Sequence, residues 1–407
     1  METRFEKIDG TSAQYYLALS VLAALAVAGF ACTLWVSQQG LWRTGMNNRV
    51  PWGVQIVMAI YYIGLSAGSL VISGLYGVFG KVEYKPFARI AVYAAMLLLI
   101  AGLLSIATDQ GRIDRFFVQP FVHLNPRSLF SINPALYVGY ILICMVYLWA
   151  LLTERSWLAP GLATLALAWA VGVHSGTGAI FGFNARMLYE SPLLPASFVV
   201  AAMASGTALM IVLIVALFKL TKRHVDDDLV LWLGRFLRAC LLVVLYFMVA
   251  ENAFRLYVVQ GREAGLYYLF EGFHSTVFWG GLIFLGCCVP LLILFNRRTG
   301  GSVRWVVFAS VLVIGGVLCE RYVIVLPGLT YSPDLFPGMQ VVGLRSQEGI
   351  TSYSISVVEV FQVLGVLGTI GFLFLWGLKA FRLMPTEARI DRPQANFGRG
   401  FSGQAAR

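Results

Sequence analysis

Long apolar segments constrain this chain more than any other feature of its sequence. A helix needs about 20 apolar residues to cross a lipid bilayer, and ten stretches reach that length. The segments between them are short, so the sequence predicts an all-α, polytopic membrane helix bundle. The expected spans are residues 15–37, 53–79, 87–107, 132–152, 157–183, 193–218, 229–257, 273–295, 304–326 and 355–381.

Composition agrees, because a chain with 59% hydrophobic and 12% charged residues is too apolar for a soluble globule of 407 residues. Residues 1–385 are expected to form one integral membrane domain, and residues 386–407 a flexible basic tail. The first apolar run is longer than the core of a signal peptide and lacks a small-residue cleavage site, so we expect it to be retained.

The distribution of Lys and Arg predicts the orientation. Ten spans place both termini on one side, which collects eighteen basic residues against ten on the other, and Arg235 and Arg238 lie within the seventh span. The positive-inside rule therefore predicts cytoplasmic termini. This bias also accounts for the net charge of +10, so nucleic-acid binding is an unnecessary interpretation.

Cysteine spacing gives no support for a metal site. All six cysteines lie inside expected spans, and no CxxC occurs, so neither a zinc site nor an iron–sulfur cluster is indicated. Buried thiols in packed helices are the simpler interpretation. The cysteines are Cys32, Cys144, Cys240, Cys287, Cys288 and Cys319.

Polar residues within the spans gather toward their outer ends. Because ionisable groups are costly inside a bilayer, such a grouping indicates a functional site, and we expect a polar pocket near the outer face. Three long outer loops, 108–131, 258–272 and 327–354, would suit docking of a soluble partner. The residues concerned are Gln55, Asp109, His174, Glu251, Asn252, His274, Glu320, Arg321, Glu359 and Gln362.

Each of these residues has more than one interpretation. His174 and His274 could ligate a haem b iron, could serve a quinone carbonyl, or could be structural. Glu251 could be an unpaired proton carrier or could pair with Arg255 at the i+4 spacing of a helix. Asp109 begins the sequence DQGRIDR, which could also be a simple interfacial ion-pair cluster containing Arg112.

Several motifs together resemble one membrane-protein family. They are PWG with YIGLSAGSLVISGLYGVFG in the second span, DQGRIDRFF after the third, the block HSGTGAIFGF…SPLLP…SGTAL, and the late ERYVIVLPG. In these motifs the chain resembles the NrfD/PsrC family, the quinone-reacting membrane subunits of polysulfide-reductase-type complexes, over about residues 51–381. Ten spans are similar to the longer members of that family.

The resemblance implies a subunit that binds menaquinone or ubiquinone near the outer face and holds no haem or metal itself. It also implies a ferredoxin-type iron–sulfur subunit on the periplasmic side, with a molybdopterin-type or multihaem cytochrome subunit beyond it, in a bacterial inner membrane. The sequence departs from the family's DLGRP motif at Gln110 and Ile113. It also has Ala59 and Ser66 where some longer members carry an acid or a histidine.

The function predicted from these observations is two-electron, two-proton exchange with a quinone. We expect catalytic contacts from His174, Asp109 and Glu251, and further quinone contacts from Gln55, Tyr61, Arg112, Asn252 and His274. A proton path could use Ser66, Ser69, Ser73, Tyr76, Glu320 and Glu359, although close helix packing also explains the small residues of the second span. A secondary transporter or channel with an outward polar cavity, or a haem b anchor, stays open as an alternative.

Overall fold

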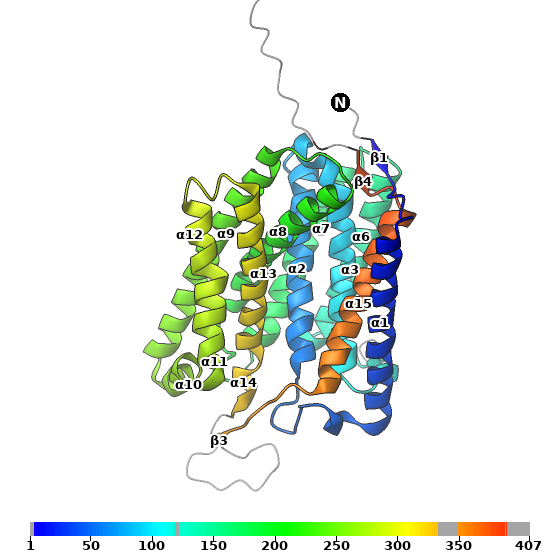
Figure 1. Cartoon of the computed structure of the whole chain (residues 1–407). Helices are drawn as coiled ribbons and strands as arrows, with labels where there is room; N and C mark the ends of the chain where they lie inside the picture. Colours follow the sequence, from blue (N-terminus) through cyan, green and yellow to red (C-terminus); the bar gives the residue numbers. More distant parts are fainter. Residues whose placement is uncertain are drawn as a thin grey trace, which may run out of the picture.

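The ten expected spans are all present as helices that run side by side (Figure 1). The computed structural model describes residues 4–116, 118, 122–184, 186–332, 349–386 and 388. Within these residues ten helical segments are long and apolar enough to cross a membrane, which confirms the predicted polytopic bundle. Nine of them are α1 (Ala13–Gln39), α2 (Val54–Gly77), α3 (Lys85–Asp109), α6 (Leu129–Leu152), α7 (Ala159–Gly182), α8 (Leu194–Leu220), α9 (Asp227–Tyr257), α13 (Val303–Val325) and α15 (Val357–Ala380).

The remaining span, the eighth, is built from α11 (Gly272–Thr276), the π-helical segment η3 (Val277–Cys288) and α12 (Val289–Phe295). Proline inside a helix lacks an N–H donor and its ring meets the carbonyl one turn earlier, so the wider winding before Pro290 relieves that conflict. Within η3, Gly286 lies directly against Gly316 of α13, where an added Cβ would overlap the neighbouring backbone.

Short elements connect the spans. The helical ones are η1 (Leu41–Arg43), η2 (Val82–Tyr84), α4 (Ile113–Phe116), α10 (Val259–Phe270) and α14 (Pro327–Thr330). Two antiparallel strand pairs occur in the described residues: β1 (Phe5–Glu6) with β4 (Met384–Pro385), and β2 (Tyr331–Ser332) with β3 (Gly349–Ile350). The predicted basic tail lies outside the described residues except for Thr386 and Ala388.

The second span is the centre of the bundle. In α2, 94% of the most apolar stretch is buried, against 11% in α1, so α2 is enclosed by the other helices whereas α1 is largely exposed at the edge of the bundle. The helix α2 packs against α3, α7, α8 and α13. Small residues permit this, because Gly68 of α2 and Gly206 of α8 lie so close that a Cβ on either would overlap the other helix.

Pairing of β1 with β4 places both ends of the described chain on one face (Figure 1). We call this the terminal face and the opposite one, which carries α10, α14 and β3, the distal face. The first and last described strands thus lie on the same face, as an even number of spans requires. That the terminal face is cytoplasmic stays a prediction from the distribution of Lys and Arg.

Candidate functional site

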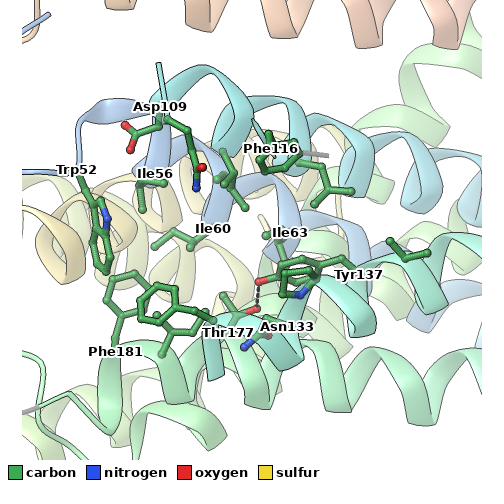
Figure 2. Close-up of a pocket in the computed structure, with 18 residues that line it drawn as sticks. Trp52, Ile56, Ile60, Ile63, Asp109, Phe116, Asn133, Tyr137, Thr177 and Phe181 are labelled. Carbon is green, nitrogen blue, oxygen red and sulfur yellow. Dashed lines mark hydrogen bonds between the residues drawn. The ribbon is translucent and has the colours of Figure 1, made fainter. Parts of the chain in front are cut away.

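A cavity of about 310 Å³ opens near the distal face between α2, α3, α6 and α7 (Figure 2). On α2 its wall is made by one helical stripe, Ile56, Ala59, Ile60 and Ile63, so the cavity is mainly apolar. We call it the distal cavity. The other lining residues are Trp52, Leu103, Ile106, Asp109, Gln110, Phe116, Phe130, Asn133, Pro134, Tyr137, Val138, Thr177, Ile180 and Phe181.

Among the described residues that line this cavity Asp109 is the one acid, and it is only 5% exposed. It ends α3 at the point where α2 begins, and its Oδ1 accepts a hydrogen bond from the Gly53 backbone N–H at 3.0 Å. The first N–H groups of a helix have no partner within the helix and carry a partial positive charge. The start of α2 therefore supplies a hydrogen-bond donor that orients the Asp109 carboxyl group.

A second carboxylate, Glu359 at the start of α15, also lies at the beginning of α2. The Tyr353 hydroxyl donates to Glu359 Oε1 and accepts from the Val54 N–H, both at 2.7 Å. Burial, together with the charge of Glu359, raises the pKa of Tyr353. Gln55 points away from the distal cavity toward α15 and donates to the Glu359 carbonyl oxygen at 3.0 Å. Asp109, Gln55 and Glu359, predicted separately, thus meet at one helix end.

Opposite Asp109, the cavity has a second polar region on α6 and α7 (Figure 2). The Asn133 amide donates to the Leu129 and Gly176 carbonyl oxygens, at 2.9 and 3.1 Å. Its Oδ1 is buried and has no hydrogen-bond partner among the described residues. The hydroxyls of Tyr137 and Thr177 are hydrogen-bonded to each other at 2.9 Å. Asn133 therefore brings an unpaired acceptor to the cavity wall, although Oδ1 itself is covered at the contact with Gly176.

Aromatic side chains surround the distal end of the cavity. The Trp52 ring lies 5.9 Å from that of Phe130 and 5.8 Å from that of Phe181, centroid to centroid. Tyr189, from the loop between α7 and α8, packs edge-on against Phe181 and donates its hydroxyl to the Val325 carbonyl oxygen at 2.6 Å. The loop that follows the HSGTGAIFGF motif is thereby fixed to the end of α13.

His174 is buried but does not line the distal cavity. Its Nδ1 lies 2.9 Å from the Ala170 carbonyl oxygen and its Nε2 2.9 Å from that of Ile63. Carbonyl oxygens only accept, so a neutral ring donates to one of them and a doubly protonated ring to both. With both nitrogens engaged, this arrangement favours neither iron ligation nor direct contact with a ligand in the distal cavity.

Glu251 and Asn252 lie elsewhere, on α9. Arg255 Nη2 is 2.7 Å from Glu251 Oε1, so the ion-pair alternative for Glu251 is the one that the structure has. These residues line a cavity of about 40 Å³ together with Glu320. Nearby, the buried Arg321 is 3.9 Å from Glu320 and lies over the Phe198 ring. The expectation that these polar residues share one pocket is therefore wrong, because Asp109 and Glu251 line different cavities.

The remaining predicted contacts do not line the distal cavity either. Tyr61 directs its hydroxyl to the Ile314 carbonyl oxygen, 3.4 Å away. His274 Nε2 lies 3.3 Å from the Thr330 hydroxyl. Arg112 forms an exposed ion pair with Asp114, whose pKa this hydrogen bond lowers to about 2. For Arg112, the structure therefore has the ion pair that the sequence offered as the alternative interpretation.

Hydroxyl groups continue from the distal cavity along the contact between α2 and α6. Ser66 Oγ is 3.1 Å from the Tyr140 hydroxyl, and Ser73 Oγ is 2.8 Å from that of Tyr147. Ser69 instead bonds to the Leu65 carbonyl oxygen of its own helix. We call Thr177–Tyr137, Ser66–Tyr140 and Ser73–Tyr147 the hydroxyl ladder. Beyond it, Tyr76 lines a separate cavity at the terminal face.

No role was predicted from the sequence for the α6 residues that reach this region. The signal was present as a 4-3-4-3 spacing, which keeps side chains on one face of a helix, at Asn133, Tyr137, Tyr140, Cys144 and Tyr147. All five are buried. Tyrosine in an apolar helix also suits ordinary packing, so only their shared face distinguishes them. Trp52, Thr177 and Phe181 lay within the quoted motifs but were not assigned a role.

Comparison with known proteins assigns the chain. Residues 42–333 match the family model described as "Polysulphide reductase, NrfD". The chain belongs to the NrfD family. It is a multi-pass integral membrane protein of that family, and the match includes every residue that lines the distal cavity.

Three relatives align along most of the chain. The chain is 38% identical to the "Hdr-like menaquinol oxidoreductase integral membrane subunit" of Archaeoglobus fulgidus, over 95% of this chain and 98% of the relative. It is 28% identical to a selenate reductase subunit of Mesobacillus selenatarsenatis, over 88% and 92%. It is 31% identical to a putative dimethyl sulfoxide reductase membrane subunit of Halobacterium salinarum, over 89% and 90%.

Proposed function

We propose that this chain is the quinone-reacting membrane subunit of a respiratory or photosynthetic redox complex, and that it oxidises quinol or reduces quinone in the distal cavity. The observation that carries the proposal is an apolar cavity with a buried carboxylate, Asp109, which ends α3 and accepts a hydrogen bond from the start of α2. The name of the Archaeoglobus fulgidus relative, a menaquinol oxidoreductase subunit, supports menaquinone as the substrate, with ubiquinone as the alternative.

The distal cavity fits such a substrate. Its volume of about 310 Å³ lies at the lower end of the roughly 300–1,000 Å³ of small-molecule sites, which are mostly apolar with a few placed polar groups. The aliphatic stripe of α2 and the rings of Trp52 and Phe181 suit a flat ring with an isoprenoid tail. Asp109 and the Asn133 side chain each supply an acceptor, one for each hydroxyl of a quinol.

Bound quinol supplies the two-electron, two-proton chemistry, and the chain's own residues position it and take up protons. We assign proton acceptance to the Asp109 carboxylate, which Gly53 orients. The Asn133 side chain and the Tyr137–Thr177 pair hold the hydroxyl at the other end. The apolar walls exclude water. Roles for His174 and Glu251 stay predictions, since neither lines this cavity.

Electrons would pass to or from a partner that docks on the distal face. We propose a ferredoxin-type iron–sulfur subunit there, with a molybdopterin-type or multihaem subunit beyond it. The relatives' names support a multisubunit setting, because all three are called subunits. The excess of Lys and Arg on the terminal side supports a periplasmic distal face in a bacterial inner membrane.

Replacing Asp109 by Asn tests the site. Asn can keep the hydrogen bond from Gly53 but cannot take a proton, so we expect quinol oxidation by the purified complex to fall by about 10²–10⁴ in kcat, with KM little changed. Asp114→Asn is the matched control, because Asp114 is exposed nearby and should leave the rate unchanged. Full activity of Asp109→Asn would exclude Asp109 as the proton acceptor.

We further propose that turnover is coupled to proton movement through the bundle along the hydroxyl ladder. Its first pair lines the distal cavity, and its last pair, Ser73–Tyr147, lies one helical turn from groups that line the cavity at the terminal face. Successive pairs are one to two helical turns apart, on the order of 5–10 Å. Hydroxyls both donate and accept, so ordered water could bridge these gaps.

The ratio of protons to electrons tests this coupling. Tyr147→Phe removes one hydroxyl of the ladder without changing the ring, so we expect quinol oxidation to continue while the proton signal of the complex in proteoliposomes with an entrapped pH dye drops at least severalfold. Tyr93→Phe is the control, because Tyr93 is also buried but donates to Leu373 on α15. Equal proton signals in both variants would contradict the ladder as a path.

A further inference from the structure

A second cavity, of about 490 Å³, opens at the terminal face, and we call it the terminal cavity. It lies between β1, the ends of α2, α3 and α6, and the turn before α7. Five basic side chains line it: Arg4, Lys85, Arg89, Arg155 and Arg382. Two acidic side chains, Glu6 and Glu154, also reach it, so its lining has an excess of three positive charges.

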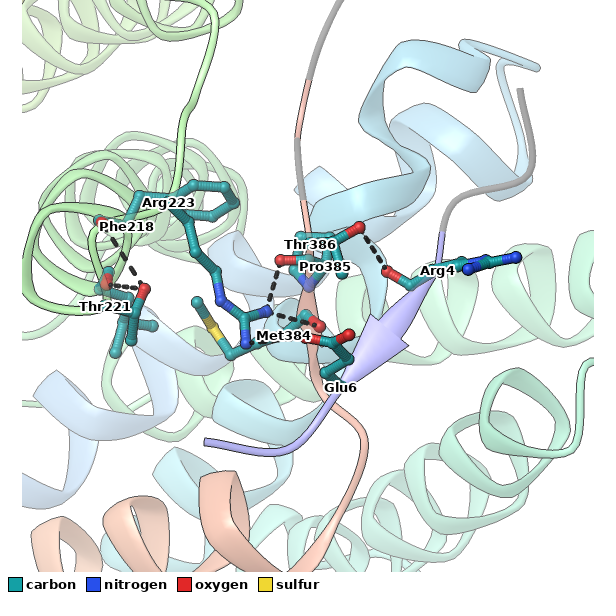
Figure 3. Close-up of polar contacts among 9 residues, drawn as sticks. Arg4, Glu6, Phe218, Thr221, Arg223, Met384, Pro385 and Thr386 are labelled. Carbon is teal, nitrogen blue, oxygen red and sulfur yellow. Dashed lines mark hydrogen bonds and ion pairs between the residues drawn. The ribbon is translucent and has the colours of Figure 1, made fainter. Parts of the chain in front are cut away.

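Both acids already have partners. Glu154 pairs with Arg89 at 3.3 Å, and Glu6 pairs with Arg223, outside the lining, at 3.5 Å (Figure 3). In the part of the chain that the structure describes, Arg4, Lys85, Arg155 and Arg382 form no ion pair. The terminal cavity therefore gathers cations that lack a counter-charge from this part of the protein.

The basic wall is held in place. Arg89 is 4% exposed; its guanidinium lies 3.6 Å from the Phe5 ring centre and donates to the Arg382 carbonyl oxygen at 3.1 Å. The strand that carries Phe5 is fixed in turn, because Arg223 donates to the Met384 and Pro385 carbonyl oxygens of β4 (Figure 3). We call the pairing of β1 and β4 with Arg223 the terminal clasp.

An apolar, lipid-facing surface continues from this cavity. Leu142, Met145, Val146 and Trp149 lie on one face of α6, each 45–55% exposed. Arg155 connects the two regions, since its guanidinium lies 4.6 Å from the Trp149 ring centre and its side chain lines the terminal cavity. Exposed tryptophan is typical of the membrane–water interface, so the cavity opens at headgroup depth.

We propose that the terminal cavity binds the phosphate of an anionic membrane phospholipid, whose acyl chains lie along the exposed face of α6. Basic pockets between membrane helices are a recognised form of lipid headgroup site. Free phosphate carries the same charged group as the lipid headgroup, but it has no acyl chains that could cover the apolar surface beside Trp149. This proposal does not depend on the quinone reaction.

The test is native mass spectrometry of the purified protein with added dioleoyl phosphatidylglycerol or the zwitterionic dioleoyl phosphatidylcholine. Arg4→Gln/Arg155→Gln removes two unpaired cations of the cavity. Each basic residue near an anionic surface is worth about fivefold in affinity, so we expect phosphatidylglycerol to bind roughly 25-fold more weakly to this variant. Lys219→Gln/Arg304→Gln, with the same charge change outside the lining, should bind it as the unchanged protein does.

Each outcome decides the proposal. Preferential binding of phosphatidylglycerol that is lost only in the cavity variant supports it. Equal binding of both lipids, or equal loss in both variants, would overturn it in favour of a general surface charge effect. If inorganic phosphate alone displaces phosphatidylglycerol and raises the unfolding temperature as much as the lipid does, the occupant is free phosphate and the lipid assignment is wrong.

Discussion

Glu251 and Arg255 lie one turn apart on α9, and only about a tenth of each side chain is exposed. Arg255 also donates to the Leu188 carbonyl oxygen, so it joins α9 to the loop between α7 and α8. Removing one partner of a buried pair leaves an uncompensated charge, whereas removing both removes the desolvation cost as well. The pair is therefore more sensitive to a single change than to a double one.

We expect Arg255→Met to destabilise the protein by about 3–5 kcal/mol, because Glu251 would remain buried and unpaired. The double variant Glu251→Gln/Arg255→Met should recover most of that loss. Thermal unfolding in detergent measures both. Arg112→Met, in the exposed pair with Asp114, should shift the unfolding temperature little. A double variant as unstable as Arg255→Met would mean that packing, and not charge, is what Arg255 contributes.

At the scale of elements, the crossing of α2 and α8 sets the position of the whole site. Gly68 and Gly206 let the two backbones touch, and α2 then presents one stripe to the distal cavity and two serines to α6. Lipid tails are as apolar as helix side chains, so the hydrophobic effect does not drive membrane helices together. Close packing of small residues supplies the attraction instead.

Gly206→Ala would force α2 and α8 apart, because its Cβ would overlap the backbone of Gly68 and Ser69. Overpacking typically costs about 1–3 kcal/mol, so we expect a lower unfolding temperature and a lower yield of monodisperse protein. Gly172→Ala on α7 is the control, since nothing lies within 4 Å of its added Cβ. If both variants unfold at the same temperature, the close approach of α2 and α8 does not determine the stability of the bundle.

At the scale of the molecule, the sequence predicted the spans closely and the site only in part. Span positions follow from length and hydropathy, which are local properties. The depth of a polar residue is equally local, so Asp109 was correctly expected near one face. Which residues share a cavity depends on how each helix is rotated about its axis, and that is set by contacts such as Gly68 with Gly206. For this reason Glu251 was grouped with Asp109 although α9 carries it to a different cavity.

The terminal clasp has a consequence for how the protein is made. A ribosome completes α1 first and α15 after the other nine described spans, yet α1 packs chiefly against α15 and β1 pairs with β4. Until α15 enters the bilayer, α1 lies there against lipid, because its partner helix α15 is still absent. A chain that stops before α15 leaves α1 and β1 without their partners, so among the described spans α15 is the one that closes the bundle.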